Sequence, residues 1–176
     1  MTPGNEIAEI STAQGTIKVE FFPKTAPKHV ESFIKLSKDG FYDGVLFHRL
    51  VTGFVIQGGD PLSKDISNKD IWGTGGPGYT IPAEFSDIPH TRGILSMARS
   101  NDPDSAGSQF FIVLEDSDLV RASLDGKYTA FGRVIEGMDV VDKIAALRKV
   151  GGTGMEAQQP LNPDDARIIS IRILER

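Results

Sequence analysis

The stretch that decides the fold is Phe47-His48-Arg49-Leu50-Val51-Thr52-Gly53-Phe54-Val55-Ile56-Gln57-Gly58-Gly59-Asp60. Its two apolar runs, joined at a glycine, predict two short strands connected by a tight turn. Side chains alternate between the faces of a strand. One face is therefore expected to hold Phe47, Arg49, Val51, Val55 and Gln57. This parity places a permanently charged guanidinium and a carboxamide on one otherwise apolar surface.

An arginine between apolar neighbours has two explanations. Its aliphatic stem can lie along the wall of a core while the head stays in water, or the guanidinium can act on something bound at that surface. A second cluster, Gly107-Ser108-Gln109-Phe110-Phe111-Ile112, alternates in the same way. One of its two phenylalanines is expected in the core, which leaves the other for a second surface.

The rest of the chain has the pattern of an all-β protein. Runs of β-branched and aromatic residues alternate with turn signals about every ten residues, and the expected strands are 7–12, 16–22, 45–51, 54–57, 94–98, 109–114, 128–135 and 167–174. Helical spacing predicts one helix after an N-cap at Thr25, ending near Gly40, and another over 138–149. Eight strands suffice for a closed barrel filled by its own side chains. We therefore expect a closed eight-stranded antiparallel β-barrel capped by two α-helices, as a single domain over 1–176.

Composition excludes several classes of protein. The chain carries 19 Lys and Arg against 24 Asp and Glu, a formal net charge of −5, and no basic half or tail offers a surface for nucleic acid. It has no cysteine, which excludes disulfides, thiolate catalysis and cysteine-based metal sites. There is no apolar run long enough to cross a membrane and no signal-peptide pattern. The sequence predicts a cytoplasmic protein without nucleic-acid or membrane partners, and a monomer because the barrel is self-contained.

Three other motifs do not support a function. Gly73-Thr74-Gly75-Gly76-Pro77-Gly78 matches a dinucleotide fingerprint, but Pro77 is incompatible with the helix that would hold a pyrophosphate. The three histidines, His29, His48 and His90, lack metal-ligand spacing. No nucleophile elbow is present. We expect no cofactor and no metal.

Taken together, the motifs of the chain resemble those of the cyclophilin peptidyl-prolyl isomerases. The resemblance runs from about Ile7 to Leu174 and preserves the order and spacing of the motifs. It rests on Phe47-His48-Arg49, Gly53-Phe54, Ile56-Gln57-Gly58-Gly59-Asp60, Gly73-Thr74-Gly75-Gly76, Leu95-Ser96-Met97-Ala98, Gly107-Ser108-Gln109-Phe110-Phe111-Ile112 and Leu124-Asp125-Gly126-Lys127. It implies the same capped eight-stranded barrel that the strand pattern favours.

The resemblance also implies which residues act on a proline-containing peptide. Arg49 matches the catalytic arginine and Gln57 the residue that steadies it and bonds the substrate backbone. The implied walls of the proline pocket are Phe54, Val55, Phe111 and Leu124. The implied neighbours are His48, Gln109 and Tyr128, the backbone of Ala98 and Arg99, and Thr74 and Ser100 beside a second pocket. Arg99, where many relatives carry asparagine, is expected to alter the preference for residues near proline more than catalysis.

The sequence departs from the family pattern at three of these positions. Tyr128 stands where many relatives have histidine, and Val55 replaces a frequent methionine. Ser123 occupies a substrate-contact position at which cyclosporin-sensitive relatives carry tryptophan, so weak cyclosporin binding is expected. The only tryptophan of the chain, Trp72, lies in an irregular loop and is not assumed to substitute. The polar run 62–71 is expected to be a solvated loop rather than an interaction loop.

Two alternatives to an isomerase that assists folding remain at this point. A protein with the same pocket could serve as a proline-peptide-binding scaffold with incidental turnover, although a retained Arg49 argues against it. A barrel that holds an apolar ligand is less favoured, because an eight-stranded barrel with so many large apolar residues should be packed solid.

Overall fold

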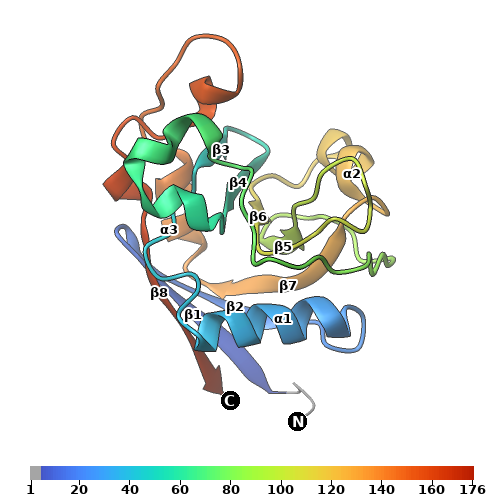
Figure 1. The fold of residues 1–176 in the computed structure, drawn as a ribbon. Helices are drawn as coiled ribbons and strands as arrows, with labels where there is room; N and C mark the ends of the chain where they lie inside the picture. Colours follow the sequence, from blue (N-terminus) through green and yellow to red (C-terminus); the bar gives the residue numbers. More distant parts are fainter. Residues whose placement is uncertain (1–4) are drawn as a thin grey trace.

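The computed structural model describes residues 5–176, which form one antiparallel sheet of eight strands with helices on both of its faces (Figure 1). The order across the sheet is β3-β4-β6-β5-β7-β2-β1-β8. All eight predicted strands are present: β1 (Glu6–Thr12), β2 (Gly15–Phe21), β3 (Arg49–Val51), β4 (Val55–Gly58), β5 (Ile94–Met97), β6 (Phe110–Val113), β7 (Thr129–Glu136) and β8 (Ile168–Glu175).

Both predicted helices are confirmed, with corrected ends. Helix α1 covers Pro27–Lys38 and α3 covers Met138–Ala145. The N-cap of α1 is Ala26, not the predicted Thr25, and it makes no side-chain cap bond. Proline at the first helical position compensates, since its fixed φ suits a helix and its missing N–H would have had no partner there.

Several short helical segments were not predicted. Helix α2 (Asp118–Leu124) is capped by the hydroxyl of Ser117, which accepts a hydrogen bond from the N–H of Val120 at 3.2 Å. At seven residues it is too short to present a clear helical period. Four 3₁₀ segments complete the description: η1 (Pro61–Lys64), η2 (Ile66–Ile71), η3 (Met155–Gln158) and η4 (Pro163–Ala166).

The sheet is a strongly curled half-barrel, and the predicted closed barrel is not confirmed. Strands β3 and β8 lie at the two ends of the strand order and do not pair with each other. The two edges meet where the segment before β3 reaches the start of β8. Leu46 bridges Arg167, and the N–H of Ile168 donates to the carbonyl of Val45 at 2.7 Å. With only three residues in β3, that edge is too short for a full ladder with β8.

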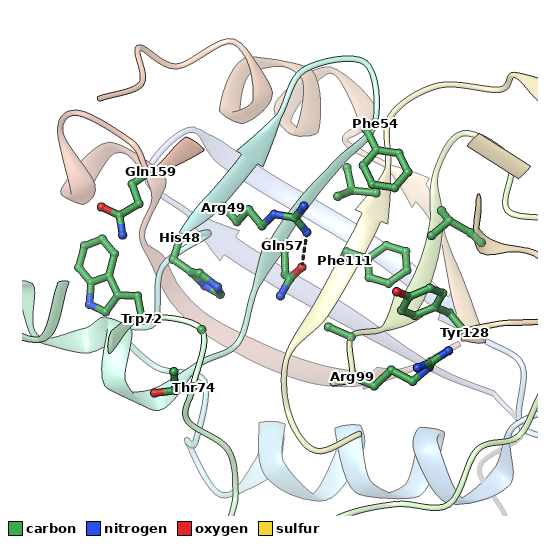
Figure 2. Close-up of a pocket in the computed structure, with 14 residues that line it drawn as sticks. His48, Arg49, Phe54, Gln57, Trp72, Thr74, Arg99, Phe111, Tyr128 and Gln159 are labelled. Carbon is green, nitrogen blue, oxygen red and sulfur yellow. Dashed lines mark hydrogen bonds between the residues drawn. The ribbon is translucent and has the colours of Figure 1, made fainter. Parts of the chain in front are cut away.

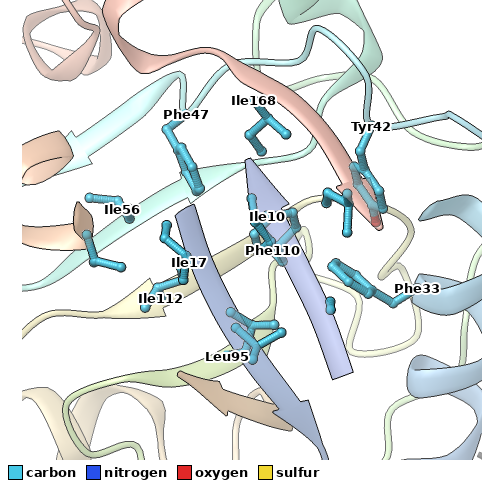
Figure 3. Packing of buried hydrophobic residues seen from close by; sticks show 14 of the residues in the cluster. Ile10, Ile17, Phe33, Tyr42, Phe47, Ile56, Leu95, Phe110, Ile112 and Ile168 are labelled. Atoms are coloured by element: carbon cyan, nitrogen blue, oxygen red, sulfur yellow. The ribbon is translucent and has the colours of Figure 1, made fainter. Parts of the chain in front are cut away.

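The main hydrophobic core fills the concave side of this sheet beneath α1 and α3 (Figure 3). Its centre is aromatic: Phe33 of α1 packs against Tyr42, Phe110 and Phe131, with ring centroids 5.1, 5.4 and 5.4 Å away. All four side chains are fully buried. An interior filled in this way gives no support to an apolar-ligand barrel.

A second, smaller cluster lies on the opposite face of the same strands. It contains Val55, Phe111 and Val113 together with Leu124 of α2, whereas their neighbours in sequence, Ile56 and Ile112, belong to the main core. The predicted alternation is therefore confirmed for the two phenylalanines, because Phe110 is in the main core and Phe111 in the second cluster. This outer cluster is the floor on which the candidate site is built.

One part of the predicted alternation is wrong. Phe47 was expected on the same face as Arg49, but it packs in the main core against Phe110 at a centroid distance of 6.0 Å. The reason is that β3 begins only at Arg49, so the two-residue period does not apply to Phe47.

Within the described residues, no helix is long and apolar enough to cross a membrane.

Candidate active site

The register of three strands brings the central residues of the site together. Arg49 of β3 is paired with Gln57 of β4, and Gln57 is paired with Phe111 of β6. Side chains directly opposite each other on one face of a sheet have Cβ atoms about 4.5–5.5 Å apart. A cation, an amide and an aromatic ring therefore form one row across the outer face of the sheet.

This row forms the floor of a cavity of about 410 Å³ (Figure 2). Most of the residues expected at the site line it: His48, Arg49, Phe54, Val55, Gln57, Thr74, Ala98, Arg99, Phe111, Leu124 and Tyr128. The cavity has two sides. In Figure 2, Phe54, Phe111 and Tyr128 lie on one side of the Arg49 guanidinium, and His48, Trp72 and Gln159 on the other.

The apolar side of the cavity is built from buried aliphatic and aromatic side chains. Val55, Phe111 and Leu124 are almost completely buried. The ring of Tyr128 stands edge-on to Phe111 at 5.5 Å. The guanidinium of Arg99 lies over the ring of Tyr128, 4.6 Å from its centroid, and donates to the carbonyl of Lys127. These contacts hold the walls in place without any ligand.

Arg49 is held by two glutamines. Its Nη1 donates to Oε1 of Gln57 at 3.2 Å, and its Nε donates to Oε1 of Gln158 at 3.0 Å. Burial lowers the pKa of Arg49 from its ordinary value, but an arginine keeps its proton in proteins. No carboxylate lines the cavity among the described residues. The guanidinium is therefore a cation whose Nη2 group has no protein partner in the described chain.

A chain of amide hydrogen bonds continues from Gln57 into a loop. Nε2 of Gln57 donates to Oε1 of Gln109 at 3.1 Å, and Nε2 of Gln109 donates to the carbonyls of Gly73 and Gly75, each at 2.9 Å. The orientation of the arginine therefore depends on backbone groups two side chains away. Gln109, which was expected to contact substrate, also serves this network.

Asp60 fixes the loop that ends this network. Its carboxylate is fully buried and accepts from the N–H of Leu62 at 2.8 Å and of Gly73 at 2.5 Å. The preceding Gly59 has φ +95°, and a Cβ there would lie 2.5 Å from the carbonyl of Ser108. Only glycine fits at this point. The Gly58-Gly59-Asp60 sequence thus supports the site by fixing the backbone of the loop next to it.

His48 contributes a neutral ring to the cavity wall. Its side chain is buried, and burial lowers its pKa to about 4. It is therefore uncharged near neutral pH, which leaves Arg49 and Arg99 as the cations that line the cavity. Within the described part of the chain, no group of three or more His, Asp or Glu side chains is arranged to hold a metal ion.

A second cavity, of about 810 Å³, adjoins the first. Its lining includes Thr74, Ser100 and Gln109, and it shares Gln57, Ala98 and Arg99 with the first cavity. The expected second pocket beside Thr74 and Ser100 is therefore present. At its border, the N–H of Ala98 donates to the carbonyl of Gln109 at 2.9 Å.

Ser123 is the expected contact residue that the structure does not bring to the site. It lies on the exposed face of α2, lines neither cavity, and donates its hydroxyl to the carbonyl of Leu119 within the same helix. Successive residues of a helix point in directions about 100° apart. Leu124 can therefore enter the pocket while Ser123 faces solvent.

Sequence reasoning missed three residues of the site. Trp72 and Gln159 line the cavity, and Gln158 bonds Arg49. Trp72 is 9% exposed and its indole N–H donates to the carbonyl of Asp65 at 3.2 Å. A lone tryptophan in a polar loop was the one available signal. Nothing local in the sequence marked the two glutamines.

The chain matches a family model and many known proteins. Residues 7–173 match the family model described as cyclophilin type peptidyl-prolyl cis-trans isomerase/CLD. A peptidyl-prolyl cis-trans isomerase of Acinetobacter baylyi is 40% identical over 171 residues, which is 96% of this chain and 86% of the relative. One of Synechococcus elongatus is 48% identical over 126 residues, covering 72% of this chain and 78% of the relative.

A solved structure agrees with the sequence relatives. A cyclophilin type isomerase of Cryptosporidium parvum, crystallised in the presence of the dipeptide Ala-Pro, superimposes with a TM-score of 0.81 at 30% identity, covering 97% of this chain and 99% of that one. The curled antiparallel sheet and the cavity on its outer face thus define a cyclophilin-type protein. The chain belongs to the cyclophilin family of peptidyl-prolyl cis-trans isomerases. It is an isomerase of X-Pro peptide bonds.

Proposed function

We propose that this isomerase binds a proline ring in the apolar side of the cavity and that Arg49 stabilises the twisted amide by donating a hydrogen bond to the prolyl nitrogen. The observation that supports the proposal is a half-buried guanidinium, with no carboxylate beside it in the cavity and a free Nη2 group, next to an apolar pocket. The natural substrates would be flexible or unfolded chains that contain X-Pro bonds.

The physical basis is the resonance of the amide. Rotation about an X-Pro bond must break that resonance, which imposes a barrier of roughly 18–20 kcal/mol. In the twisted state the prolyl nitrogen regains its lone pair and can accept a hydrogen bond that neither planar isomer accepts. A donor aimed at that nitrogen therefore favours the transition state over both ground states. Because a proline ring bound against the apolar walls would displace water, the interaction would be stronger there than in solution.

The competing interpretation is a proline-peptide-binding scaffold whose turnover is incidental. Exchange spectroscopy on an Ala-Pro-Phe peptide separates the two, because it measures the interconversion rate and the binding shifts on the same sample. We expect the wild-type protein to accelerate cis/trans exchange at catalytic concentrations. Shifts in the peptide resonances without acceleration would leave only the scaffold function.

The rate should depend little on pH near neutrality. Arg49 keeps its proton, and His48, whose pKa is lowered to about 4, stays neutral between about pH 6 and 8. Below about pH 5 we expect the rate to fall, because a protonated His48 would place a second positive charge beside Arg49. A series of exchange measurements from about pH 3.5 to pH 8, with the fold checked at each pH, tests both parts of this expectation. A bell-shaped profile centred near neutrality would contradict it.

Cyclosporin should bind weakly. Ser123 supplies no indole donor, and the indole N–H of Trp72 is already donated to the carbonyl of Asp65. Trp72 also lies on the far side of Arg49 from Tyr128 (Figure 2). We expect Ser123→Trp to raise cyclosporin affinity, because a tryptophan supplies an indole donor and is long enough to extend from the exposed face of α2 over the cavity edge that Leu124 lines. Isothermal titration calorimetry measures the change. Inhibition of the unmodified protein at low-nanomolar concentrations would refute this expectation.

A further inference from the structure

The loop between α3 and β8 reaches the site through one side chain. Gln158, at the end of η3, accepts a hydrogen bond from Nε of Arg49 at 3.0 Å. The two residues are separated by 109 positions in the sequence. Gln158 is itself half-buried and does not line the cavity, so its contact with the site is the arginine.

The loop is anchored well enough to hold that glutamine in place. At its base, the N–H of Val150 donates to the carbonyl of Gln159 at 2.9 Å, and the N–H of Leu161 to the carbonyl of Arg148 at 2.8 Å. The side chain of Gln159 ties this base to the loop after β4, because its Nε2 donates to the carbonyl of Lys69 at 3.2 Å. Figure 1 shows the orange-red loop beside the green 3₁₀ segments and β3.

The hydrogen bond between Arg49 and Gln158 restricts the orientation of the guanidinium more than the bond to Gln57 does alone. Gln57 accepts from Nη1 alone, and an arginine has several rotatable bonds, so a single contact leaves the guanidinium plane free to swing about it. An acceptor at Nε together with one at Nη1 fixes the plane. The Nη2 group is then the part of the guanidinium that remains available to a ligand.

We propose that Gln158 is a positioning residue for catalysis, which holds the guanidinium of Arg49 in the plane that directs Nη2 into the cavity. This inference rests on the proposed role of Arg49. It assigns to the loop between α3 and β8 a part in the reaction. Misplacement of a reacting group by about 1 Å can cost about 100-fold in rate, so the loss of one of two acceptors should cost about tenfold.

The test compares two replacements of similar size. Gln158→Met removes the acceptor, whereas Gln158→Glu keeps an acceptor oxygen in the same place. We expect Gln158→Met to lower kcat/KM about tenfold, mainly through kcat. Gln158→Glu, which keeps the acceptor but adds a negative charge beside Arg49, should lose less than Gln158→Met. Glu156→Gln, on the exposed side of the same 3₁₀ segment, is the matched control and should behave as wild type.

A spectroscopic measurement adds a readout that a merely structural role would not change. In the wild-type protein the ¹⁵Nε–¹Hε resonance of Arg49 should be sharp and slow to exchange with water, and in Gln158→Met it should broaden or exchange faster while the thermal midpoint stays unchanged. Equal kcat/KM and an unchanged Nε resonance in Gln158→Met would overturn the inference. Absence of exchange acceleration in the wild type would instead overturn the proposed function, so the two failures are distinguishable.

Discussion

Replacing Arg49 with alanine is expected to lower kcat/KM for X-Pro isomerisation by about 100- to 1000-fold, the cost found when one preorganised donor to a transition state is removed. The loss should fall on kcat, because the apolar pocket that holds the proline ring stays intact and peptide binding depends on it. Exchange spectroscopy with a peptide titration gives kcat and KM separately. Chemical shifts of the main core verify that the variant remains folded.

Arg49→Lys is the informative companion to this variant. Lysine keeps the positive charge but has neither the planar fork nor the Nε–H that Gln158 accepts. If the charge alone stabilised the twisted amide, lysine would restore most of the rate. Because hydrogen bonds to both Gln57 (Figure 2) and Gln158 fix the guanidinium, we expect lysine to recover only a small part. Equal acceleration by wild type and Arg49→Ala would show that the mechanism is wrong.

The parts of the site that lie within strands could be predicted from sequence. Arg49 and Gln57 were expected on one face because their side chains alternate with period two along their strands. Alternation also separated Phe110 from Phe111, and the family resemblance assigned Phe111 to the pocket. The same rule failed at Phe47, which precedes its strand and turns into the main core. A local period is reliable only where the regular backbone that produces it is present.

The parts of the site contributed by loops could not be derived in this way. Trp72 and Gln158 reach the site through the loops after β4 and after α3, and their placement depends on contacts such as that of Gln159 with Lys69, 90 residues away. Leu124 and Tyr128 were placed by family resemblance, which transfers tertiary information that the residues alone do not carry. That transfer placed Ser123 wrongly, because a short helix turns it towards solvent.

The stability of the fold should depend most strongly on the aromatic centre of the main core. Phe33→Ala is expected to lower the free energy of unfolding by about 3–5 kcal/mol, the usual cost of removing a buried phenylalanine ring. Phe33 is fully buried, and its ring contacts Phe21 as well as the three aromatic rings of the core. The cavity left behind cannot collapse easily, because its neighbours come from a helix and several strands. Urea denaturation followed by circular dichroism measures the effect.

Two comparisons determine whether this loss is a matter of packing. Phe85→Ala, at a ring that is 43% exposed, should cost well under half as much as Phe33→Ala, and a similar cost at both sites would contradict the argument. Phe33 lies on the opposite face of the sheet from Arg49. Under conditions where Phe33→Ala is still folded, its kcat/KM should therefore remain near that of wild type. The two largest expected effects are thus separable, because Phe33 contributes to the stability of the fold and Arg49 to the rate of isomerisation.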